Sequence, residues 1–401
     1  LIEGQIGVFF ILQLHHAEVI FMVKISILMP ACNVEKYIRE CMDSVVNQTL
    51  KDIEIICIDD GSKDLTGEIL DDYAEKDKRI KVIHKPNSGY GNSMNIGLQQ
   101  AVGEYIGIIE TDDFAELNMF EELYDVAKRC NADVVKSNYF TYVSKPEPQS
   151  TYFEVLKPYD LYDKVFCPSD NQDIFRVRPC IWSGIYRRKM LMDYNISFTE
   201  TPGASYQDTS FAFKVWACAE RACLVRNAYL HYRTDNANSS VKSSAKIFCL
   251  CDEYASTEEF LEKNPQKKEK LVRLKNSLKY ESYRWNLQRL TFEFKYAFLL
   301  QMHKEFVIEQ EKGLLDKKYF TDWAWQNLMG ILNDMDGYYR EKCRQDFNGY
   351  SSIEDMAATI KKKDMKIRTL EQTLKDMQNS KSFRMGRAAT YIPRKIRDIM
   401  K

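Results

Sequence analysis

Two acidic side chains, Glu110 and Asp112, follow the apolar run 105–109 and are the first candidates for chemistry in this sequence. Residues two apart on an extended chain point to the same side, so both carboxylates can face one ligand. Carboxylate oxygens are the ligands that a divalent cation such as Mg²⁺ prefers, and the same cation can hold a diphosphate. A second interpretation stays open, because Asp113 precedes a helical pattern and the acids would also suit the start of that helix.

A second acidic pair, Asp59 and Asp60, ends the apolar run 53–58. Paired carboxylates at the end of a buried strand are costly unless a cation, water or a hydrogen-bond donor meets them. A nucleoside base or a ribose would offer such N–H and O–H donors. A solvated turn that caps the next helix, with Gly61 at positive φ, would satisfy the pair equally well.

A glycine-rich loop, 85–91, follows a third apolar run and precedes a helical pattern. Gly89 and Gly91 permit a close approach of the backbone to a ligand. Asn92 and Asn95 place two side-chain amides in the first turns of that helix, where backbone N–H groups favour an anion. Loops of this kind are common, so the meaning of this one comes from its acidic neighbours.

Short apolar strands must position these loops. Each strand leads into a polar loop and then into a helical pattern, which is the order of an open α/β sheet. In such a sheet the loops gather at the carboxyl edge, where ligands bind. The sequence therefore predicts a Rossmann-like mixed sheet flanked by helices, with a site for a phosphorylated, nucleotide-like ligand. The predicted strands are 25–29, 53–58, 80–84 and 105–109.

The motifs PACNVEKYI, IDDGS, GYGNSMNIG and GEYIGIIETDD occur in this order between residues 24 and 113. Together they resemble the nucleotide-binding half of family 2 glycosyltransferases, which are inverting enzymes of the GT-A fold. The resemblance implies a DxD motif that binds the sugar diphosphate with a divalent metal, Mn²⁺ or Mg²⁺. It assigns the nucleoside pocket to Pro30, Ala31 and Glu35. It assigns the contacts with base and ribose to Asp59 and Asp60. The DxD motif is Glu110, Thr111 and Asp112.

Two positions depart from the family pattern. Glu110 replaces the first aspartate of the DxD motif, so its carboxylate stands one methylene further from the chain. Met94 stands where the family carries an arginine that faces the phosphates, which leaves Asn95 as the polar residue of that motif. We expect another cation, Arg233, to take over the missing charge.

The second half of the domain carries the features that the resemblance assigns to the acceptor side. The segment 145–173 is expected to be an acceptor-side insertion, and 179–188 resembles the family segment beneath the donor sugar. Trp182 can stack on a pyranose face or fill the core, and both interpretations stay open. The family places a general base at a helix start, and the matching residue is Asp208, with Gln207 where a first acid is usual.

Direct displacement at an anomeric carbon needs one carboxylate that takes the proton of the attacking hydroxyl. We expect Asp208 to be that base, whereas the pattern alone would also fit an acid that stabilises a helix N-terminus. His231 and Arg233 lie in a segment that resembles the part of the family that closes over the diphosphate. His231 is therefore either a third metal ligand or a structural histidine.

Composition narrows the class of protein. With 401 residues, 45% apolar and 29% charged, the chain is expected to be globular with more than one domain. A net charge of -1 argues against a dedicated nucleic-acid binder. The 11 cysteines show no metal-ligand spacing, which favours reduced thiols and a cytoplasmic location. No apolar run reaches the length of a membrane-spanning helix.

The C-terminal third has three characters. Residues 247–350 show a dense helical pattern typical of a packed bundle. Apolar residues spaced three and four apart over 354–378 predict a short coiled coil and a homodimer, or equally a helix docked on the bundle. The basic tail 380–401 either binds an anionic membrane surface, at about 1 kcal/mol per basic residue, or is solvated.

We therefore expect an inverting glycosyltransferase that moves a sugar from a UDP-sugar to a saccharide, polyol-phosphate or lipid-linked acceptor. We expect it to act in cell-surface polysaccharide synthesis, in the cytoplasm on the inner face of the membrane. A non-catalytic nucleotide-sugar-binding or scaffold protein on the same fold is the first alternative. A nucleotidyltransferase is the second, but it would need a basic, glycine-rich loop directly after the first strand. The expected segments of the chain are a non-native or disordered extension 1–21, a GT-A domain 22–246, a helical bundle 247–350, a coiled-coil-like helix 351–379 and the basic tail 380–401.

Overall fold

The computed structural model describes residues 22–157, 159–236, 247–290, 292–344, 361–362, 364–369 and 372. The expectations for the extension 1–21 and for the basic tail 380–401 lie outside the described residues. Only a few positions of the segment 351–379 are described, so the coiled coil and the dimer stay predictions.

Four parallel strands match the runs expected from the sequence, and they are β1 (Ile25–Ala31), β2 (Ile53–Asp59), β3 (Ile80–His84) and β4 (Tyr105–Ile108). Every residue of β1 is buried, the polar Ser26 included, which agrees with its largely apolar pattern. The registers align Ala31 with Asp59 and Asp59 with His84. The first three strands therefore end together at one edge of the sheet, as the sequence predicted.

The second half of the domain extends the same sheet with β5 (Phe114–Ala115), β6 (Val134–Val143), β7 (Gln149–Phe153), β8 (Val165–Phe166), β9 (Gly184–Arg187) and β10 (Ala222–Arg233). The order in the ten-stranded sheet is β3-β2-β1-β4-β9-β6-β10-β5, with β7 on β6 and β8 on β10. Strand β9 runs antiparallel to both β4 and β6, so the sheet is mixed, as expected. Strand β10 pairs with β5 and so brings His231 beside Phe114, next to the acidic loop.

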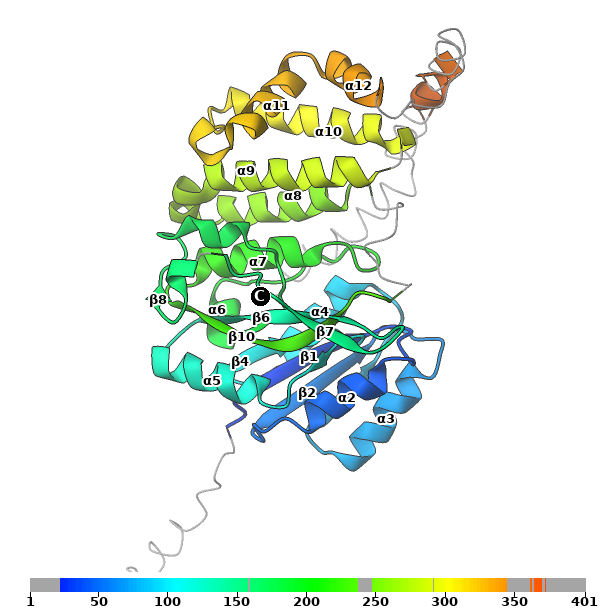
Figure 1. Cartoon of the computed structure of the whole chain (residues 1–401), viewed down its shortest axis with the longest axis vertical. Helices are drawn as coiled ribbons and strands as arrows, with labels where there is room; N and C mark the ends of the chain where they lie inside the picture. The colour runs from blue at the N-terminus through cyan, green and yellow to red at the C-terminus, as the bar shows by residue number, and fades with distance from the viewer. Residues whose placement is uncertain are drawn as a thin grey trace, which may run out of the picture. The chain divides into compact units, whose positions relative to one another are not determined.

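Helices cover both faces of this sheet (Figure 1). Figure 1 shows α2 and α3 on one face and α4 and α7 on the other, which is the arrangement of a doubly wound α/β domain. The helix α2 buries Ile38, Cys41, Met42 and Val45, whose spacing of three and four residues puts them on one face of the helix. The helices of this part are α2 (Ile38–Val46), α3 (Thr66–Lys76), α4 (Tyr90–Gln100), α5 (Met119–Cys130), α6 (Arg188–Asp193) and α7 (Gln207–Cys218), with short 3₁₀ turns η1 (Tyr159–Leu161) and η2 (Gln172–Arg176).

The remaining described chain is helical, in agreement with its sequence pattern. Its elements are α8 (Cys249–Glu262), α9 (Pro265–Arg289), α10 (Phe292–Glu311), η4 (Lys317–Tyr319), α11 (Asp322–Asn333) and α12 (Met335–Arg344). The described residues divide into two compact units, and Cys249–Leu271 belong to the first, together with the sheet. The expected boundary after residue 246 therefore differs from the structure, because α8 packs as part of the sheet-containing unit.

The second unit has an aromatic core with charged groups enclosed in it. Tyr280, Tyr283, Phe298 and Phe306 are fully buried, and their rings meet largely edge to face. The buried Lys279 forms an ion pair of 2.8 Å with Glu305. This packing agrees with the expectation of a helical bundle.

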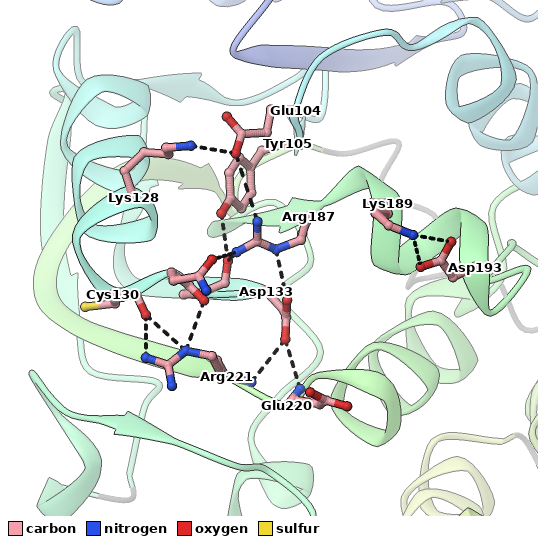
Figure 2. A network of polar contacts seen from close by, with 12 residues as sticks. Glu104, Tyr105, Lys128, Cys130, Asp133, Arg187, Lys189, Asp193, Glu220 and Arg221 are labelled. Atoms are coloured by element: carbon pink, nitrogen blue, oxygen red, sulfur yellow. Dashed lines mark hydrogen bonds and ion pairs between the residues drawn. The ribbon is translucent and has the colours of Figure 1, made fainter.

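A polar network ties four strands together at the end of the sheet opposite to the acidic loops (Figure 2). Asp133 Oδ1 accepts a hydrogen bond from Arg187 Nε at 2.9 Å, and its Oδ2 accepts the N–H groups of Glu220 and Arg221 at 3.0 and 3.1 Å. The Arg187 guanidinium also lies 5.2 Å from the centre of the Tyr105 ring. One carboxylate thus joins the starts of β6 and β10 to the end of β9.

This network predicts that substitutions of Asp133 and Lys189, both labelled in Figure 2, have very different effects on the free energy of unfolding. Asp133→Ala leaves Arg187 Nε and two backbone N–H groups without their acceptor, so we expect it to lower the free energy of unfolding by about 2–3 kcal/mol. Lys189→Ala removes an exposed i,i+4 ion pair with Asp193 and should change the free energy of unfolding by less than about 0.5 kcal/mol. Urea unfolding of both variants measures the two free energies, and equal values would contradict the view that Asp133 joins the three strands.

Candidate active site

Asp59 lies at the carboxyl end of β2, where the strand edge meets the loop after β3. Its Oδ1 accepts the Ser62 N–H at 3.0 Å, and its Oδ2 lies 2.9 Å from His84 Nδ1. Burial alone would raise the pKa of Asp59, but the hydrogen bonds from Ser62 and His84 outweigh it and hold the pKa below its ordinary value. Asp59 is therefore a carboxylate at neutral pH, as a residue that accepts ligand hydrogen bonds would be.

Asp60 anchors the loop that follows β3. Its Oδ1 accepts the Ser88 N–H at 2.8 Å and forms an ion pair with Lys85, and its Oδ2 accepts the Gly89 N–H at 2.9 Å. Both oxygens of this buried side chain are thus used inside the protein. The sequence assigned Asp60 to the base and ribose, and the structure adds that it fixes the loop 85–89.

The residues expected to line the nucleoside pocket surround the end of β1. The Pro30 carbonyl accepts the Thr111 hydroxyl at 2.8 Å, and the Ala31 carbonyl accepts the Asp60 N–H at 2.9 Å. Glu35 accepts a backbone N–H of the turn before α3 at 3.1 Å. These contacts join the loop after β2 and the loop after β4 to the end of β1, one on each side of the strand.

Glu110 and Asp112 lie on the loop after β4 and have different partners. The Tyr90 hydroxyl donates to Glu110 Oε1 at 2.6 Å, and the Asn236 amide donates to Asp112 Oδ2 at 2.8 Å. Burial, helped by the nearby Asp112 and Asp208, raises the pKa of Glu110 to about 8 despite the hydrogen bond from Tyr90. A cation bound between these acids would lower that pKa again, because it favours the charged carboxylate.

Asp113 and Arg233 support this loop from behind. Asp113 Oδ1 accepts the Arg233 N–H at 2.8 Å, whereas Oδ2 has no hydrogen-bond partner among the described residues. Burial raises the pKa of Asp113 well above its ordinary value. Arg233 Nε donates to the Asp112 carbonyl at 2.9 Å, and the guanidinium forms an ion pair with Glu40. In this arrangement the charge of Arg233 positions the acidic loop, a role that the sequence did not suggest.

His231 does not have the surroundings of a metal ligand. Its Nε2 lies 2.9 Å from Glu116 Oε1, and its Nδ1 lies 2.7 Å from Ser150 Oγ. The ring is stacked on Phe114 at 4.4 Å and on Phe140 at 4.7 Å. Because both ring nitrogens are engaged, no lone pair remains for a metal. The structure therefore favours the structural histidine over the third metal ligand.

Asn95, which the sequence predicted to face an anion, holds the segment that precedes α7. Its side chain bonds the N–H and the carbonyl of Phe198 at 2.9 and 3.0 Å, and its amide also donates to Glu200 at 2.9 Å. A Cβ on Gly91 would lie only 2.1 Å from the Thr199 carbonyl oxygen, so this position requires glycine. The glycine-rich loop is thus in direct backbone contact with the segment that leads to Asp208.

Trp182 packs inside an aromatic cluster. Its ring stacks on Tyr232 at a centroid distance of 5.2 Å and meets Tyr139 edge-on at 4.8 Å, and only 8% of the residue is exposed. These contacts favour the core interpretation over stacking on a sugar. Arg178, which the sequence did not single out, lies against the same cluster, with Nη1 3.5 Å from the Tyr139 hydroxyl.

Asp208 stands in the first turn of α7. The residue before that helix, Tyr206, has φ of +65°, a costly conformation for a bulky side chain that its surroundings must enforce. Gln207, at the position of the missing first acid, is buried and donates to the Thr201 hydroxyl at 2.9 Å. Burial raises the pKa of Asp208 to about 6, against backbone hydrogen bonds at the helix start and the charge of Arg178. A carboxyl group with such a pKa is well suited to exchange protons near neutral pH.

The acidic loop supplies part of a binding site for a divalent cation, and the remaining oxygen ligands would come from a bound diphosphate and water. Within the described ranges, no three His, Cys, Asp or Glu side chains come together as a ready metal cluster. Glu110 and Asp112 offer hard oxygen ligands, and Mg²⁺ or Mn²⁺ is commonly held by one or two carboxylates together with phosphate and water oxygens. The unpartnered buried oxygen of Asp113 also fits a place that accepts positive charge.

The fold and this acidic edge define the class of the domain, which is the GT-A type of α/β domain. Residues 26–193 match the sequence model of glycosyl transferase family 2, and this part of the chain belongs to that family. Asp208, His231 and Arg233 lie beyond the matched range. S. aureus TarS, solved as residues 1–349 in complex with UDP, superposes with a TM-score of 0.52 at 21% identity, over 82% of this chain and 93% of that one. This likeness shows a shared fold.

Curated relatives are named as glycosyltransferases. EpsJ of Bacillus subtilis, described as an uncharacterized glycosyltransferase, is 35% identical over 222 residues, which are 54% of this chain and 62% of EpsJ. The glycosyltransferase GlyG of Streptococcus pneumoniae is 43% identical over 119 residues, 29% of this chain and 40% of GlyG. The chain thus spans less than two thirds of the length of these relatives.

The surroundings of His231 predict that it contributes to stability and not to metal affinity. His231→Phe keeps a ring between Phe114 and Phe140 but loses the hydrogen bonds to Glu116 and Ser150. We expect the free energy of unfolding to fall by about 1–2 kcal/mol. In the presence of UDP, the Mn²⁺ affinity measured by calorimetry should stay within about twofold, because no ligand is removed.

Asp112→Ala is the control for this comparison, because it removes a carboxylate that we place in the metal site. Its Mn²⁺ affinity should fall by at least about tenfold. A comparable fall in His231→Phe would restore the histidine to the metal site.

Proposed function

We propose that this chain is an inverting glycosyltransferase that moves a sugar from a UDP-sugar to a hydroxyl group of a saccharide or polyol-phosphate acceptor. One observation carries the proposal: Tyr90, whose hydroxyl donates to Glu110 at 2.6 Å, also donates its backbone N–H at 3.3 Å to the Gly203 carbonyl, in the segment that leads to Asp208. A candidate base and a candidate diphosphate site thus share one place. The family membership of residues 26–193 supports sugar transfer. The fold shared with TarS, whose structures hold UDP and UDP-GlcNAc, supports a UDP-sugar donor.

In an inverting transfer the acceptor oxygen attacks the anomeric carbon while the bond to the diphosphate breaks. The acceptor hydroxyl loses its proton in the same step, and Asp208 takes that proton on its carboxylate. A divalent cation held by Glu110 and Asp112 would neutralise the departing diphosphate, a Lewis-acid contribution. Asn236 and Arg233 fix Asp112, and Tyr90 orients Glu110, so the acidic loop is held in place before substrate arrives.

We further propose that the acceptor belongs to a cell-surface polysaccharide, free or linked to lipid, and that the chain works in the cytoplasm at the membrane. The cysteines of the described residues are all free thiols, which supports a reducing compartment. In the part of the chain that the structure describes, no helix is long and apolar enough to cross a membrane.

The first test is the release of UDP from a panel of UDP-sugars with Mn²⁺ or Mg²⁺, with water as the acceptor. We expect one sugar to be hydrolysed slowly and only with metal. Asp208→Asn should lower kcat by about 10²–10⁴-fold and leave UDP affinity unchanged, because it removes a base and no nucleotide contact. Asp112→Ala should lower turnover by at least about 100-fold together with metal dependence.

Lys189→Ala serves as the matched control, since its exposed ion pair lies at the opposite end of the sheet. If Asp208→Asn keeps full turnover, the base is another residue. If no UDP-sugar is bound or hydrolysed by the parent protein, the non-catalytic binding or scaffold alternative takes precedence.

The pKa of Asp208 predicts the pH dependence of the reaction. A base acts only in its charged form, and a carboxyl group with a pKa of about 6 is mostly protonated below that pH and mostly charged above it. We expect kcat/KM to be level above about pH 7 and to fall about tenfold per unit below pH 6. Rates measured from pH 5 to 9 check this, and Asp208→Asn should lack the acid limb. An acid limb that survives in Asp208→Asn would assign it to another group.

A further inference from the structure

The helix α8 places a carboxylate inside the protein, beside the start of α7. Glu253 has no exposed surface. Its Oε2 accepts the Ser210 hydroxyl, and the Ser210 backbone nitrogen lies 3.4 Å from the same oxygen. Its other oxygen, Oε1, has no hydrogen-bond partner among the described residues. The chemistry assigned to the site above makes no use of this buried acid.

The start of α7 lacks a cap of its own. The first four N–H groups of a helix have no partner within the helix, and a side chain at the preceding residue commonly accepts one of them. That residue is Tyr206, whose side chain makes no such bond. Ser210 is the fourth residue of α7, and its N–H is the first that a regular helix pairs, with the carbonyl of the residue before the helix. Glu253 adds an acceptor to this turn from a different helix and puts negative charge near the end of α7 that the helix dipole favours.

The other groups around Glu253 fit this role. The Thr199 hydroxyl lies 3.4 Å from the Ser210 hydroxyl, close enough to Glu253 to lower its pKa. Burial raises the pKa of Glu253 to about 7, against the hydroxyl groups of Ser210 and Thr199. The charged groups that act on it are Lys214, which bonds to Ser256 at 2.7 Å, and Asp208. Glu253 thus connects the segment before α7 with the turn that carries Asp208.

We infer that Glu253 is a positioning residue for sugar transfer: through Ser210 it fixes the first turn of α7 and with it the direction of Asp208. The inference rests on the proposed function, in which Asp208 is the base. It extends the catalytic unit to α8, beyond the matched range 26–193 and beyond the boundary at residue 246 that the sequence suggested.

The test compares Glu253→Ala, Glu253→Gln and Ser210→Ala by hydrolysis of UDP-GlcNAc with Mn²⁺ and by the dissociation constant of UDP. Glu253→Ala should lower kcat by about 10–100-fold, because a small displacement of a reacting group is costly. Ser210→Ala, which loses only the hydroxyl, should lower it by about 3–10-fold. UDP affinity should stay within about twofold in both. Glu253→Gln keeps a carbonyl oxygen that can accept both bonds, so its kcat should remain within about threefold of the parent.

Thr257→Val is the matched control. It removes a buried hydroxyl from the same helix, and that hydroxyl bonds the Glu253 carbonyl within α8 and nothing in α7. Its kcat should equal that of the parent. If Thr257→Val loses as much activity as Glu253→Ala, or if kcat and UDP affinity fall together in Glu253→Ala, α8 merely supports the fold and the inference is wrong.

The two proposals fail in distinguishable ways. Full turnover in Asp208→Asn would remove the base and with it the purpose of Glu253. Loss of turnover in Asp208→Asn with parental kcat in Glu253→Ala would overturn only the positioning role. If Glu253→Ala does not fold, Ser210→Ala decides, and an unchanged kcat in that variant overturns the inference.

Discussion

The burial of acidic side chains at the carboxyl edge of the sheet is the constraint on which the site depends. A buried carboxylate is costly unless donors or cations meet it. The protein meets this cost for Asp60 with Lys85 and two backbone N–H groups, and this also fixes the glycine-rich loop. At Glu110 and Asp113 the compensation is incomplete, and their pKa values are raised. The acidic loop is thereby left with a demand for positive charge that a metal and its diphosphate suit.

The architecture of the first half could be predicted because its strands are buried on both faces. Strands such as β1 then appear as largely apolar runs, and each is followed by a loop with an evident polar signature. The strand β7, by contrast, has every residue exposed and is held by backbone pairing with β6. Its sequence QSTYF has no buried face to leave an apolar pattern, so no strand was expected there.

Only the part of the site whose residues lie close together in the sequence could be predicted from residue type and spacing. Glu110 and Asp112 are two positions apart and share one loop, as expected. Tyr90 and Asn236 were missed because their partners lie 20 and 124 residues away along the chain. His231 was considered as a ligand because a histidine near acids can bind metal, yet its phenylalanine neighbours come from other strands. Contacts of this kind arise only when the sheet forms.

The contact between the glycine-rich loop and the segment before α7 has a mechanical consequence. A Cβ on Gly89 would lie 2.6 Å from the Thr201 carbonyl oxygen, and one on Gly91 would lie 2.1 Å from the Thr199 carbonyl oxygen, so backbone touches backbone at both positions. At these two glycines no side chain separates the two segments. A shift of the loop is therefore passed on to the segment that leads to Asp208. In the proposed reaction, donor binding and the direction of the proposed base are coupled through this backbone contact.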